Sequence, residues 1–453
     1  MTLIKSISGI RGIIDSSIDS TLVAKYVKAF CRISANRTIL LARDTRRSGD
    51  KFIGNSIEIL KRLNKEYVNC GIIPTPTAQY LIKKNNYAGG IVFTASHNPE
   101  NWNGMKFIDS NGIFLDYKKF NDLENEAKNI EINHLEYTAL QSHFRNEKDL
   151  SEESISTHIN DILSLNINNF NLVKNKKIKV AIDCVNGATS IALPMLLNKF
   201  NCEIIAINST YNEFFSRSPE PIPSNLKTLS KCVIDNNADL GLATDPDGDR
   251  LSIIDNKGNP LGEELTLSMC VYYFLKYFPE NRKYPIVTNL STSLLSEKIS
   301  QEYDTPFVRT PVGEINVVKK MEEMGSLIGG EGNGGIILKE SHLGRDSLVG
   351  SMIILNLLAK ENKSLNEIYN LFPKYYIQKS SLKLDNSSNS SIDKIKQRFN
   401  DQNIIDIDGF KIIWKNEWVH IRKSNTEPIL RIISESQSEN RSIELIDMIK
   451  GLI

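Results

Sequence analysis

A serine lies in a short polar loop, Thr94-Ala95-Ser96-His97-Asn98-Pro99, directly after the strand-like segment Gly89 to Thr94. A serine hydroxyl at the end of a strand is open to a substrate, and it becomes an effective nucleophile when a base or a metal ion assists it. Asn-Pro also begins many turns, so a plain turn with an incidental Ser-His neighbour is the alternative interpretation. Lys106, shortly after this loop, brings a cation close to it in sequence.

A second polar cluster, Asp245-Pro246-Asp247-Gly248-Asp249-Arg250, follows the apolar run Leu240 to Ala243. The carboxylates of Asp245, Asp247 and Asp249 stand at alternate positions, so one loop can direct their oxygens to a single point. Hard, oxygen-bound cations such as Mg²⁺ or Ca²⁺ suit that arrangement. Without a cation the three carboxylates would repel one another, and the cluster therefore predicts a metal site.

Two other kinds of acidic loop fit this cluster less well. An EF-hand loop requires Gly at its sixth position and Glu at its twelfth, where this chain has Arg250 and Asn256. An aspartyl-phosphate phosphatase uses an Asp-x-Asp pair, but Asp249 stands where that motif would place a small hydroxyl residue.

A glycine-rich cluster runs from Gly329 to Gly335 and formally contains the dinucleotide-binding pattern GxGxxG. That pattern requires a helix after it, so that the helix N-terminus can bind a pyrophosphate. Here the strand-like run Ile336 to Leu338 follows, which predicts a hairpin instead. Glu331 and Asn333 in the hairpin offer a carboxylate and an amide to sugar hydroxyls, whereas a plain glycine-rich hairpin is the alternative.

The fourth cluster lies near the C-terminus and combines cations with hydroxyls: Arg422, Lys423, Ser424, Asn425, Thr426 and, shortly after, Arg431. Backbone N–H groups, hydroxyls and arginine forks in one loop form an anion-binding site, and arginine matches phosphate oxygens bidentately. A solvated basic loop is the alternative, but it would not need the interleaved Ser and Thr. We therefore predict phosphate binding.

The composition indicates a globular protein without a polyanionic partner. Of 453 residues, 40% are hydrophobic and 24% charged, with 55 basic and 54 acidic residues and a net charge of +1. This balance gives no electrostatic attraction to nucleic acid or to an anionic membrane, so an anionic substrate must meet local positive charge. The six scattered cysteines, the absence of a long apolar run and an N-terminus without signal-peptide features predict a cytoplasmic protein with reduced thiols.

Strand-like and helical segments alternate along most of the chain, which predicts an α/β fold with doubly wound, largely parallel sheets. Ligands bind such sheets at the carboxyl ends of the strands, where the polar clusters fall. The segments that carry this prediction are the strands Thr38–Ala42, Gly89–Thr94, Lys177–Asp183, Asp239–Thr244, Pro285–Asn289 and Ser326–Gly329, and the helices Phe52–Leu63 and Ser347–Leu358.

The C-terminal part differs, because strands at Lys411–Trp414, Trp418–Ile421 and Ile429–Ser434 follow a polar stretch at Asp385–Ser391 that we expect to be a loop. This pattern predicts an α+β domain. We place the domains at 1–150, with the serine loop; 151–256, with the acidic loop; 257–365, with the glycine-rich loop; and 366–453, with the basic loop. The first three are expected to be α/β.

The clusters and their order resemble those of the α-D-phosphohexomutase family, which includes phosphoglucomutases, phosphomannomutases and phosphoglucosamine mutases. The resemblance extends from Ser8-Gly9-Ile10-Arg11-Gly12 to the C-terminal basic loop, and the serine and acidic loops together are specific to the family. It implies three doubly wound mixed-sheet α/β domains and a C-terminal α+β domain in a heart shape around a central cleft.

The resemblance also implies a role for each cluster. Ser96 would carry a phosphoryl group and, with Asp245, Asp247 and Asp249, bind one Mg²⁺. Glu331 and Asn333 would contact the sugar hydroxyls, and the non-reacting phosphate would be bound by the C-terminal residues Arg422, Ser424, Asn425, Thr426 and Arg431. The catalytic centre would be completed by His97, Lys106, Arg250 and Arg11, with Lys106 as a general acid or base.

Three positions depart from the family's usual pattern. Asn425 stands where many members have glycine, and asparagine tolerates a left-handed backbone. The sugar loop ends in Asn333-Gly334-Gly335 instead of Ser-Gly-His, and the loop Thr310 to Gly313 leads to Glu314 instead of histidine. The last two affect the inferred sugar specificity and the second proton-transfer residue, but not the phosphoryl chemistry.

The resemblance implies an enzyme that moves a phosphoryl group between positions 1 and 6 of a hexose phosphate, through a phosphoserine and a hexose 1,6-bisphosphate intermediate. Of the members named above, bacterial phosphoglucosamine mutases are the most similar, so glucosamine 6-phosphate is the favoured substrate. A phosphomannomutase or phosphoglucomutase is the alternative. A metal-dependent sugar phosphatase and a non-catalytic sugar-phosphate sensor are alternatives from other classes, and the oligomeric state stays open.

Overall fold

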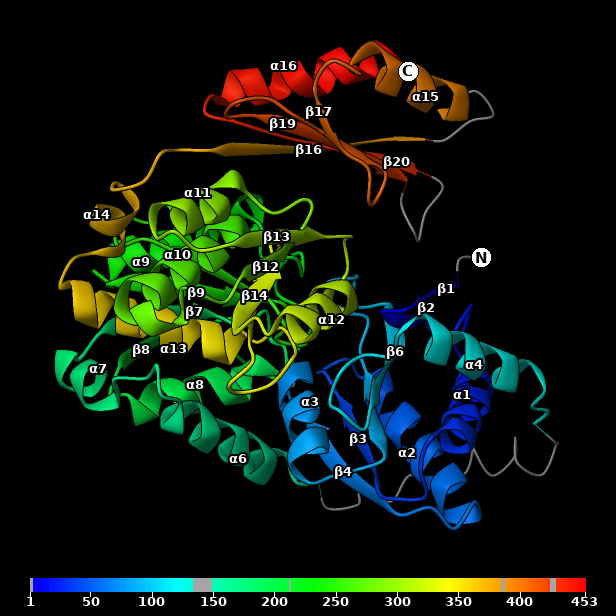
Figure 1. Ribbon diagram of the computed structural model, residues 1–453. Coiled ribbons are helices and arrows are strands. Elements are labelled where there is room, and N and C mark those ends of the chain that lie inside the picture. The colour runs from blue at the N-terminus through cyan, green and yellow to red at the C-terminus, as the bar shows by residue number, and fades with distance from the viewer. Residues whose placement is uncertain (1–2, 133–148, 212, 384–387, 424–428) are drawn as a thin grey trace.

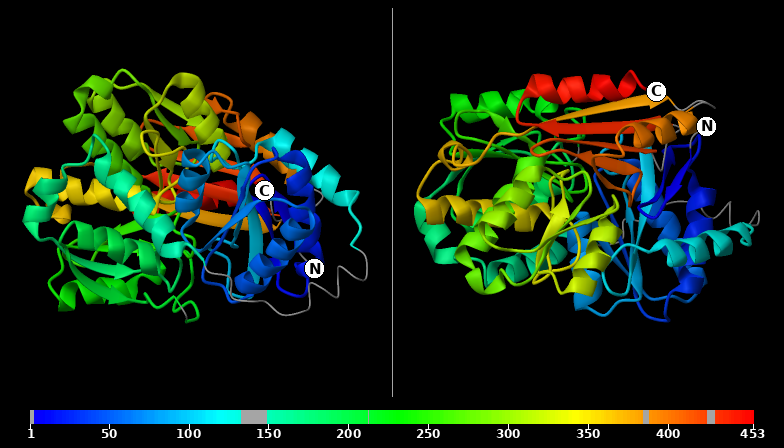
Figure 2. Two further views of the ribbon diagram at one scale, coloured as in Figure 1. Left: turned by 90° about the horizontal axis from the view of Figure 1, so that it is seen from below. Right: turned by 45° about the horizontal axis from the view of Figure 1, so that its top comes forward.

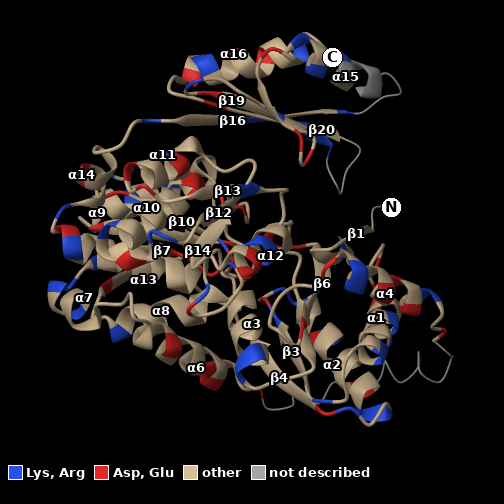
Figure 3. Ribbon diagram, viewed as in Figure 1, with Lys and Arg blue, Asp and Glu red and all other residues tan. Residues whose placement is uncertain are grey.

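The computed structural model describes residues 3–132, 149–211, 213–383, 388–423 and 429–453, which form four sheets with their helices. Figures 1 and 2 show the sheets in chain order around a common centre, with the C-terminal sheet on one side of the other three. Basic and acidic residues are interspersed over all four parts, as expected from the balanced charge (Figure 3). None of the described helices is long and apolar enough to cross a membrane.

The first sheet has six strands in the order β1-β2-β6-β5-β3-β4. Strands β5, β3 and β4, at one side of the sheet, are parallel, and β6 runs antiparallel to β5 and β2. Residues of α1, α2 and α4 pack on one face and those of α3 on the other. The elements are β1 Ile4–Ser6, β2 Gly9–Ile13, α1 Ser20–Ile33, β3 Ile39–Arg43, α2 Ser48–Arg62, β4 Tyr67–Ile72, α3 Thr75–Lys84, β5 Gly89–Phe93, β6 Trp102–Asp109 and α4 Tyr117–Lys128.

The second sheet has the order β11-β10-β9-β7-β8, with β7 parallel to β8 and β9, and β10 antiparallel to β9. Strand β11 pairs with β10, so this sheet continues past residue 256, where we had placed the boundary. The elements are α6 Ser151–Ser164, α7 Phe170–Lys176, β7 Lys179–Asp183, α8 Thr189–Lys199, β8 Glu203–Ile207, η1 Pro223–Asn225, α9 Lys227–Asp235, β9 Leu240–Thr244, β10 Leu251–Ile254 and β11 Pro260–Leu261.

The third sheet has the order β13-β12-β14-β15, in which β14 and β15 form the antiparallel hairpin predicted at the glycine-rich cluster. A strand follows that cluster and not a helix, so the dinucleotide pattern is accidental. The elements are α10 Gly262–Tyr277, η2 Pro279–Asn281, β12 Ile286–Asn289, α11 Leu294–Glu302, β13 Phe307–Thr310, α12 Glu314–Met324, β14 Ile328–Glu331, β15 Gly335–Leu338, α13 Ser347–Glu361 and α14 Leu365–Tyr369.

The C-terminal sheet is antiparallel throughout, in the order β16-β20-β19-β18-β17, and α15 and α16 cover the face turned away from the rest of the molecule (Figure 1). The predicted loop at Asp385–Ser391 is wrong in its last part, because α15 begins at Ser388; residues 384–387 lie outside the described residues. The elements are β16 Tyr376–Lys383, α15 Ser388–Arg398, β17 Asn403–Ile405, β18 Phe410–Ile413, β19 Trp418–Lys423, β20 Ile429–Ser436 and α16 Glu439–Lys450.

The first three parts share one continuous apolar core, whereas the C-terminal part has its own. Buried residues of α3, α6, α8, α10 and α13 belong to a single cluster that joins the first three sheets. The C-terminal sheet packs a separate cluster against α15 and α16. All six cysteines are unpaired, as predicted for reduced thiols. The α/β class with a C-terminal α+β part is confirmed, and the domain boundaries stay predictions.

A buried carboxylate joins the C-terminal part to the third. Glu435 on β20 is fully buried, and its oxygens accept hydrogen bonds from the hydroxyl of Ser293, from the backbone N–H of Leu294 (2.7 Å) and from the indole of Trp418 (2.6 Å). Ser293 and Leu294 begin α11, so the carboxylate caps a helix of the neighbouring part.

Replacing Glu435 with alanine is expected to lower stability by about 3 kcal/mol, because three buried donors lose their acceptor. Urea unfolding followed by tryptophan fluorescence would measure this, together with faster proteolytic release of the C-terminal part. The exposed Glu439→Ala variant on α16 is the matched control. If the two variants unfold at the same urea concentration, Glu435 does not join the two parts.

Candidate active site

All four sheets contribute loops to one cavity of about 560 Å³. The cavity is lined by sequence-predicted residues from the first part (Arg11, Ser96, His97 and Lys106), the second (Arg250), the third (Glu331 and Asn333) and the fourth (Arg422 and Arg431). The structure thus brings together clusters that are far apart in sequence. Ser424, Asn425 and Thr426 lie outside the described residues.

The backbone of Ser96 is in the left-handed conformation, with φ of 49°, which costs a non-glycine residue about 1 kcal/mol. The fully buried guanidinium of Arg46 holds it there by donating to the carbonyl oxygens of Ser96 (2.8 Å) and Asn98 (2.6 Å). The backbone N–H of Ser96 donates to Thr94 Oγ1 (2.9 Å), which in turn donates to Asp44 (2.6 Å). The serine loop is therefore rigidly positioned after β5.

The acidic loop joins β9 to β10, and all three aspartates are fully buried. Ser96 Oγ lies 3.2 Å from Oδ2 of Asp245, although the two residues are separated by 149 positions in sequence. Oδ2 of Asp247 accepts two hydrogen bonds of 2.6 Å, one from the hydroxyl of Thr75 and one from Nζ of Lys106. The contact between the serine and the acidic cluster, which the sequence could only predict, is therefore present.

Two buried cations neutralise part of the acidic cluster. Lys106 Nζ lies 2.6 Å from Asp247 Oδ2 and 2.9 Å from Asp249 Oδ2, and Arg345 Nη2 lies 2.7 Å from the same oxygen of Asp249. Burial alone would raise the pKa of Asp249, but Arg345 and Lys106 hold it well below its usual range. By contrast, burial and the adjacent Asp249 and Asp247 raise the pKa of Asp245 well above its usual value.

The remaining oxygens of the cluster fit a metal ion. Ligand atoms of the three aspartates lie within 4.8 Å of one another. Oδ1 of Asp247 and Oδ1 of Asp249 are buried and have no hydrogen-bond donor among the described residues. Buried carboxylate oxygens without a donor are costly, and a divalent cation would satisfy them and remove the repulsion that raises the pKa of Asp245. The cluster is thus suited to a hard cation.

Arg345, which the sequence analysis missed, contacts three carboxylates from different loops. Its guanidinium donates to Asp249 (2.7 Å), Glu314 (2.9 Å) and Glu331 (2.8 Å). Burial raises the pKa of Glu314 to about 7, against the lowering effect of Arg345. A lone arginine before a helix gives no spacing signal, so only the fold shows that it joins the acidic loop to the glycine-rich hairpin.

Glu331 and Asn333 both face the cavity, but their hydrogen bonds differ. The carboxylate of Glu331 also accepts from Asn289 Nδ2 (2.8 Å) and from the backbone N–H of Gly313 (2.9 Å), so the protein itself fixes its orientation. Oδ1 of Asn333 is buried and has no donor among the described residues. Asn333 is therefore ready to accept a hydrogen bond from a ligand.

The predicted cations surround the cavity on several sides. Arg11 Nη1 donates to Asn98 Oδ1 (2.9 Å), and Arg250 Nη1 donates to Glu220 Oε1 (3.0 Å). Nδ1 of His97 lies 3.4 Å from Ser96 Oγ, and the charge of Arg250, together with burial, holds the pKa of His97 well below its usual value. His97 is therefore neutral at pH 7.

Two arginines of the C-terminal sheet complete this positive surface. Arg422 on β19 and Arg431 on β20 stand opposite each other in the sheet, and both line the cavity. A chain of net charge +1 thus gathers positive charge in one place, as an anionic ligand requires.

Comparison with known proteins agrees with this geometry. Family models described as phosphoglucomutase/phosphomannomutase α/β/α domains I, II and III match residues 3–134, 156–258 and 263–375. A protein of Sulfurisphaera tokodaii named phosphoglucosamine/phosphogalactosamine mutase is 33% identical over 98% of each chain. A phosphoglucomutase/phosphomannomutase of Thermococcus kodakarensis is 31% identical and covers 97% of this chain and 96% of its own.

Solved structures show the same fold. The structure of a phosphoglucomutase/phosphomannomutase family protein from Burkholderia thailandensis superposes with a TM-score of 0.80 over 99% of this chain and 97% of its own, at 21% identity. The chain belongs to the phosphoglucomutase/phosphomannomutase family of the α-D-phosphohexomutases, and it is a phosphohexomutase.

Proposed function

We propose that this phosphohexomutase interconverts glucosamine 6-phosphate and glucosamine 1-phosphate and that Ser96 carries the phosphoryl group between the two positions. The 3.2 Å contact between Ser96 Oγ and Asp245, inside a cavity that all four sheets line, is the observation that supports this most. The serine hydroxyl contacts the acidic cluster and its residue lines the cavity, whereas Thr75, whose hydroxyl donates to Asp247, does not line it. A phosphoryl group on Ser96 would lie among the cations of the cavity.

The proposed site includes one Mg²⁺, bound by Asp245, Asp247 and Asp249 together with an oxygen on Ser96. The donor-free oxygens of Asp247 and Asp249 support this assignment. When bound, the ion neutralises charge on the transferring phosphoryl group, which is the main requirement of phosphoryl transfer.

Lys106 is proposed as the proton donor at the reacting centre. Burial alone would lower its pKa, but Asp247 and Asp249 raise the pKa above the usual value of a lysine. With these two carboxylates beside it the side chain is an ammonium ion, which can donate a hydrogen bond or a proton at the reacting centre. Its 2.6 Å contact with Asp247 and its position in the lining of the cavity that also contains Ser96 support this role.

The reaction proceeds in two transfers. The bond between the Ser96 oxygen and phosphorus breaks, and the free hydroxyl of the sugar monophosphate takes the phosphoryl group. The proton that this hydroxyl loses ends on the Ser96 oxygen, which gives a hexose 1,6-bisphosphate and a free serine hydroxyl. This intermediate turns in the cavity and returns its other phosphoryl group to Ser96. Arg422 and Arg431, on the C-terminal sheet, would bind whichever phosphate is not reacting, together with Ser424, Asn425 and Thr426, which lie between them in the sequence and outside the described residues.

Glucosamine is proposed as the sugar because the cavity contains carboxylates that can meet an amino group. Glu220, Glu264, Glu314 and Glu331 all line it. The relative from Sulfurisphaera tokodaii carries the name phosphoglucosamine/phosphogalactosamine mutase, which supports the same choice. The relative from Thermococcus kodakarensis is named for glucose and mannose phosphates, so these sugars are the competing substrates.

Ser96→Ala is expected to abolish turnover, because the group that carries the phosphoryl is lost. Intact-mass spectrometry of the parent should show the extra mass of one phosphoryl group on part of the protein, and the variant should lack it. Ser48→Ala, in the neighbouring helix α2, is the control and should keep the phosphoryl mass. Steady release of inorganic phosphate at the rate of substrate loss would instead indicate a phosphatase.

The purified protein should turn over glucosamine 1-phosphate with a kcat/KM at least about tenfold above that for glucose 1-phosphate or mannose 1-phosphate. Tenfold corresponds to about 1.4 kcal/mol of transition-state stabilisation, which a contact with the amino group can supply. Coupled assays with each sugar phosphate would measure the three values. Equal turnover of the glucose and mannose phosphates, with glucosamine phosphate inert, would overturn the proposed sugar.

Arg345→Met is expected to reduce kcat at least about 100-fold, because three carboxylates that position the acidic loop and the hairpin lose their common cation. Arg345→Lys keeps the charge but not the three directed N–H groups, so an intermediate loss is expected. Arg309→Lys, a partly buried arginine outside the cavity, is the matched control. If Arg345→Lys and Arg309→Lys retain the same kcat, the proposed positioning role is wrong.

A further inference from the structure

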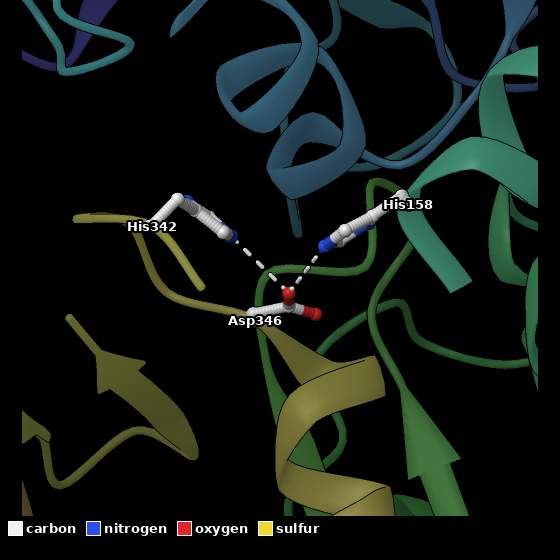
Figure 4. Close-up of side chains that lie close together, drawn as sticks. All are labelled: His158, His342 and Asp346. Carbon is white, nitrogen blue, oxygen red and sulfur yellow. Dashed lines mark hydrogen bonds and ion pairs between the residues drawn. The ribbon is translucent and has the colours of Figure 1, made fainter. Parts of the chain in front are cut away.

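A second group of metal-ligating side chains lies outside the active-site cavity. His158 on α6, His342 after β15 and Asp346 at the start of α13 converge on one point (Figure 4), and none of the three lines the cavity. Their exposed fractions are 0%, 2% and 1%. The helices α3 and α6 and the start of α13, from three different parts of the chain, meet here.

The distances between the ligand atoms match those around a tetrahedral ion. Nε2 of His158 and Nε2 of His342 each lie 3.2 Å from the same oxygen, Oδ2 of Asp346. Zinc binds imidazole nitrogen and carboxylate oxygen at about 2.0–2.1 Å, and tetrahedral ligands at that bond length are about 3.3 Å apart. The two distances to Asp346 therefore match this spacing, and all the ligand atoms lie within 4.8 Å of one another.

Hydrogen bonds alone leave buried polar atoms unsatisfied in this group. The contact of His342 with Asp346 is a hydrogen bond. Nε2 of His158 lies as close to the same oxygen, but this contact lacks hydrogen-bond geometry and is an ion pair only when the ring is protonated. Nδ1 of His342 also lacks a partner among the described residues. A buried polar atom without a hydrogen bond costs about 1–3 kcal/mol, and an ion between Nε2 of His158 and the carboxylate would remove this cost at Nε2.

The surroundings of the group orient two of the three ligands, His158 and Asp346. Nδ1 of His158 lies 3.0 Å from the hydroxyl of Thr77, and its ring stacks on Tyr80 with centroids 4.8 Å apart. Oδ1 of Asp346 accepts from the backbone N–H groups of Leu348 and Val349, which leaves Oδ2 to face the histidines. Metal-binding histidines typically have such a partner on the second ring nitrogen, because it fixes the ring and its tautomer.

We propose that His158, His342 and Asp346 bind one Zn²⁺ ion, with water as the fourth ligand, and that this ion has a structural role distinct from the Mg²⁺ of the active site. Two imidazoles and a carboxylate favour Zn²⁺ over Mg²⁺, which prefers oxygen ligands only. All three ligands are buried, which suits a stabilising ion and not a catalytic one.

The position of the group connects it to the active site. Arg345, the residue before Asp346, contacts Asp249 and Glu331, and the next residue, Ser347, donates its hydroxyl to the carbonyl oxygen of Gly248 in the acidic loop (2.7 Å). An ion that fixes Asp346 therefore also fixes the two neighbours that hold the acidic loop. Loss of Zn²⁺ should lower thermal stability first and activity second.

The test uses the full chain, dialysed against excess Mg²⁺ so that the acidic cluster is occupied, and then supplied with Zn²⁺ or with Co²⁺ as a spectroscopic probe. Elemental analysis should find one Zn²⁺ per chain after gel filtration, and X-ray absorption should show imidazole nitrogen around it. Co²⁺ should give the strong visible absorption of a low-coordinate site. A shell of oxygen ligands alone, or no retained ion, would overturn the proposal.

Variants separate this site from the active site. Thr77→Val keeps the side-chain shape and removes only the partner of His158, so it should weaken Zn²⁺ binding about 10- to 100-fold. His342→Gln should abolish binding and the rise in melting temperature that Zn²⁺ causes in the parent. Asp245→Asn, in the acidic cluster, should bind Zn²⁺ as the parent does. Equal Zn²⁺ affinity in the parent, Thr77→Val and His342→Gln would contradict the assignment.

Discussion

The structure depends on the approach of one hydroxyl to a group of buried carboxylates. Ser96 Oγ lies 3.2 Å from Asp245, and each of the two residues is held in an energetically unfavourable state. The serine has a left-handed backbone that Arg46 stabilises, and the carboxylates are buried close to one another, which raises the pKa of Asp245. Both costs are typical of a site that is preorganised for charge that arrives with the ligand.

Cations from separate loops make this arrangement possible. Lys106 comes from β6 and Arg345 from the segment before α13. The charged group of each side chain contacts Asp249 in the acidic loop. Arg345 also contacts Glu331, which lines the cavity, and the adjacent Asp346 and Ser347 contact the histidine pair and Gly248. Three consecutive residues therefore couple the glycine-rich hairpin, the acidic loop and the junction between α3, α6 and α13.

The sequence predicted the parts of the site that consist of contiguous motifs. The serine loop, the Asp-x-Asp-x-Asp loop and the glycine-rich hairpin each follow a recognisable strand, and parallel strands bring such loops to a common edge. The alternation of strands and helices likewise predicted the α/β class. These inferences rest on residues that are close together in the sequence, so they do not require knowledge of the tertiary structure.

Residues that act alone could not be found in this way. Arg46 and Arg345 carry no spacing signal, because their importance comes from the carbonyls and carboxylates that the fold places around them. His158 and His342 are far apart in sequence, and only the packing of α6 against the start of α13 brings them together. The start of α15 at Ser388 was missed because a polar stretch rich in Ser and Asn favours loops more than helices.

The most direct test of the central contact is ³¹P NMR of the phosphorylated protein with Mn²⁺ in place of Mg²⁺. If the acidic cluster holds the ion beside Ser96, the phosphoserine resonance should broaden beyond detection with Mn²⁺ and should stay sharp in the Asp247→Asn variant. A phosphoserine resonance that stays sharp when Mn²⁺ is bound to the parent would show that the ion and the serine are not neighbours, and the account of this enzyme would be wrong.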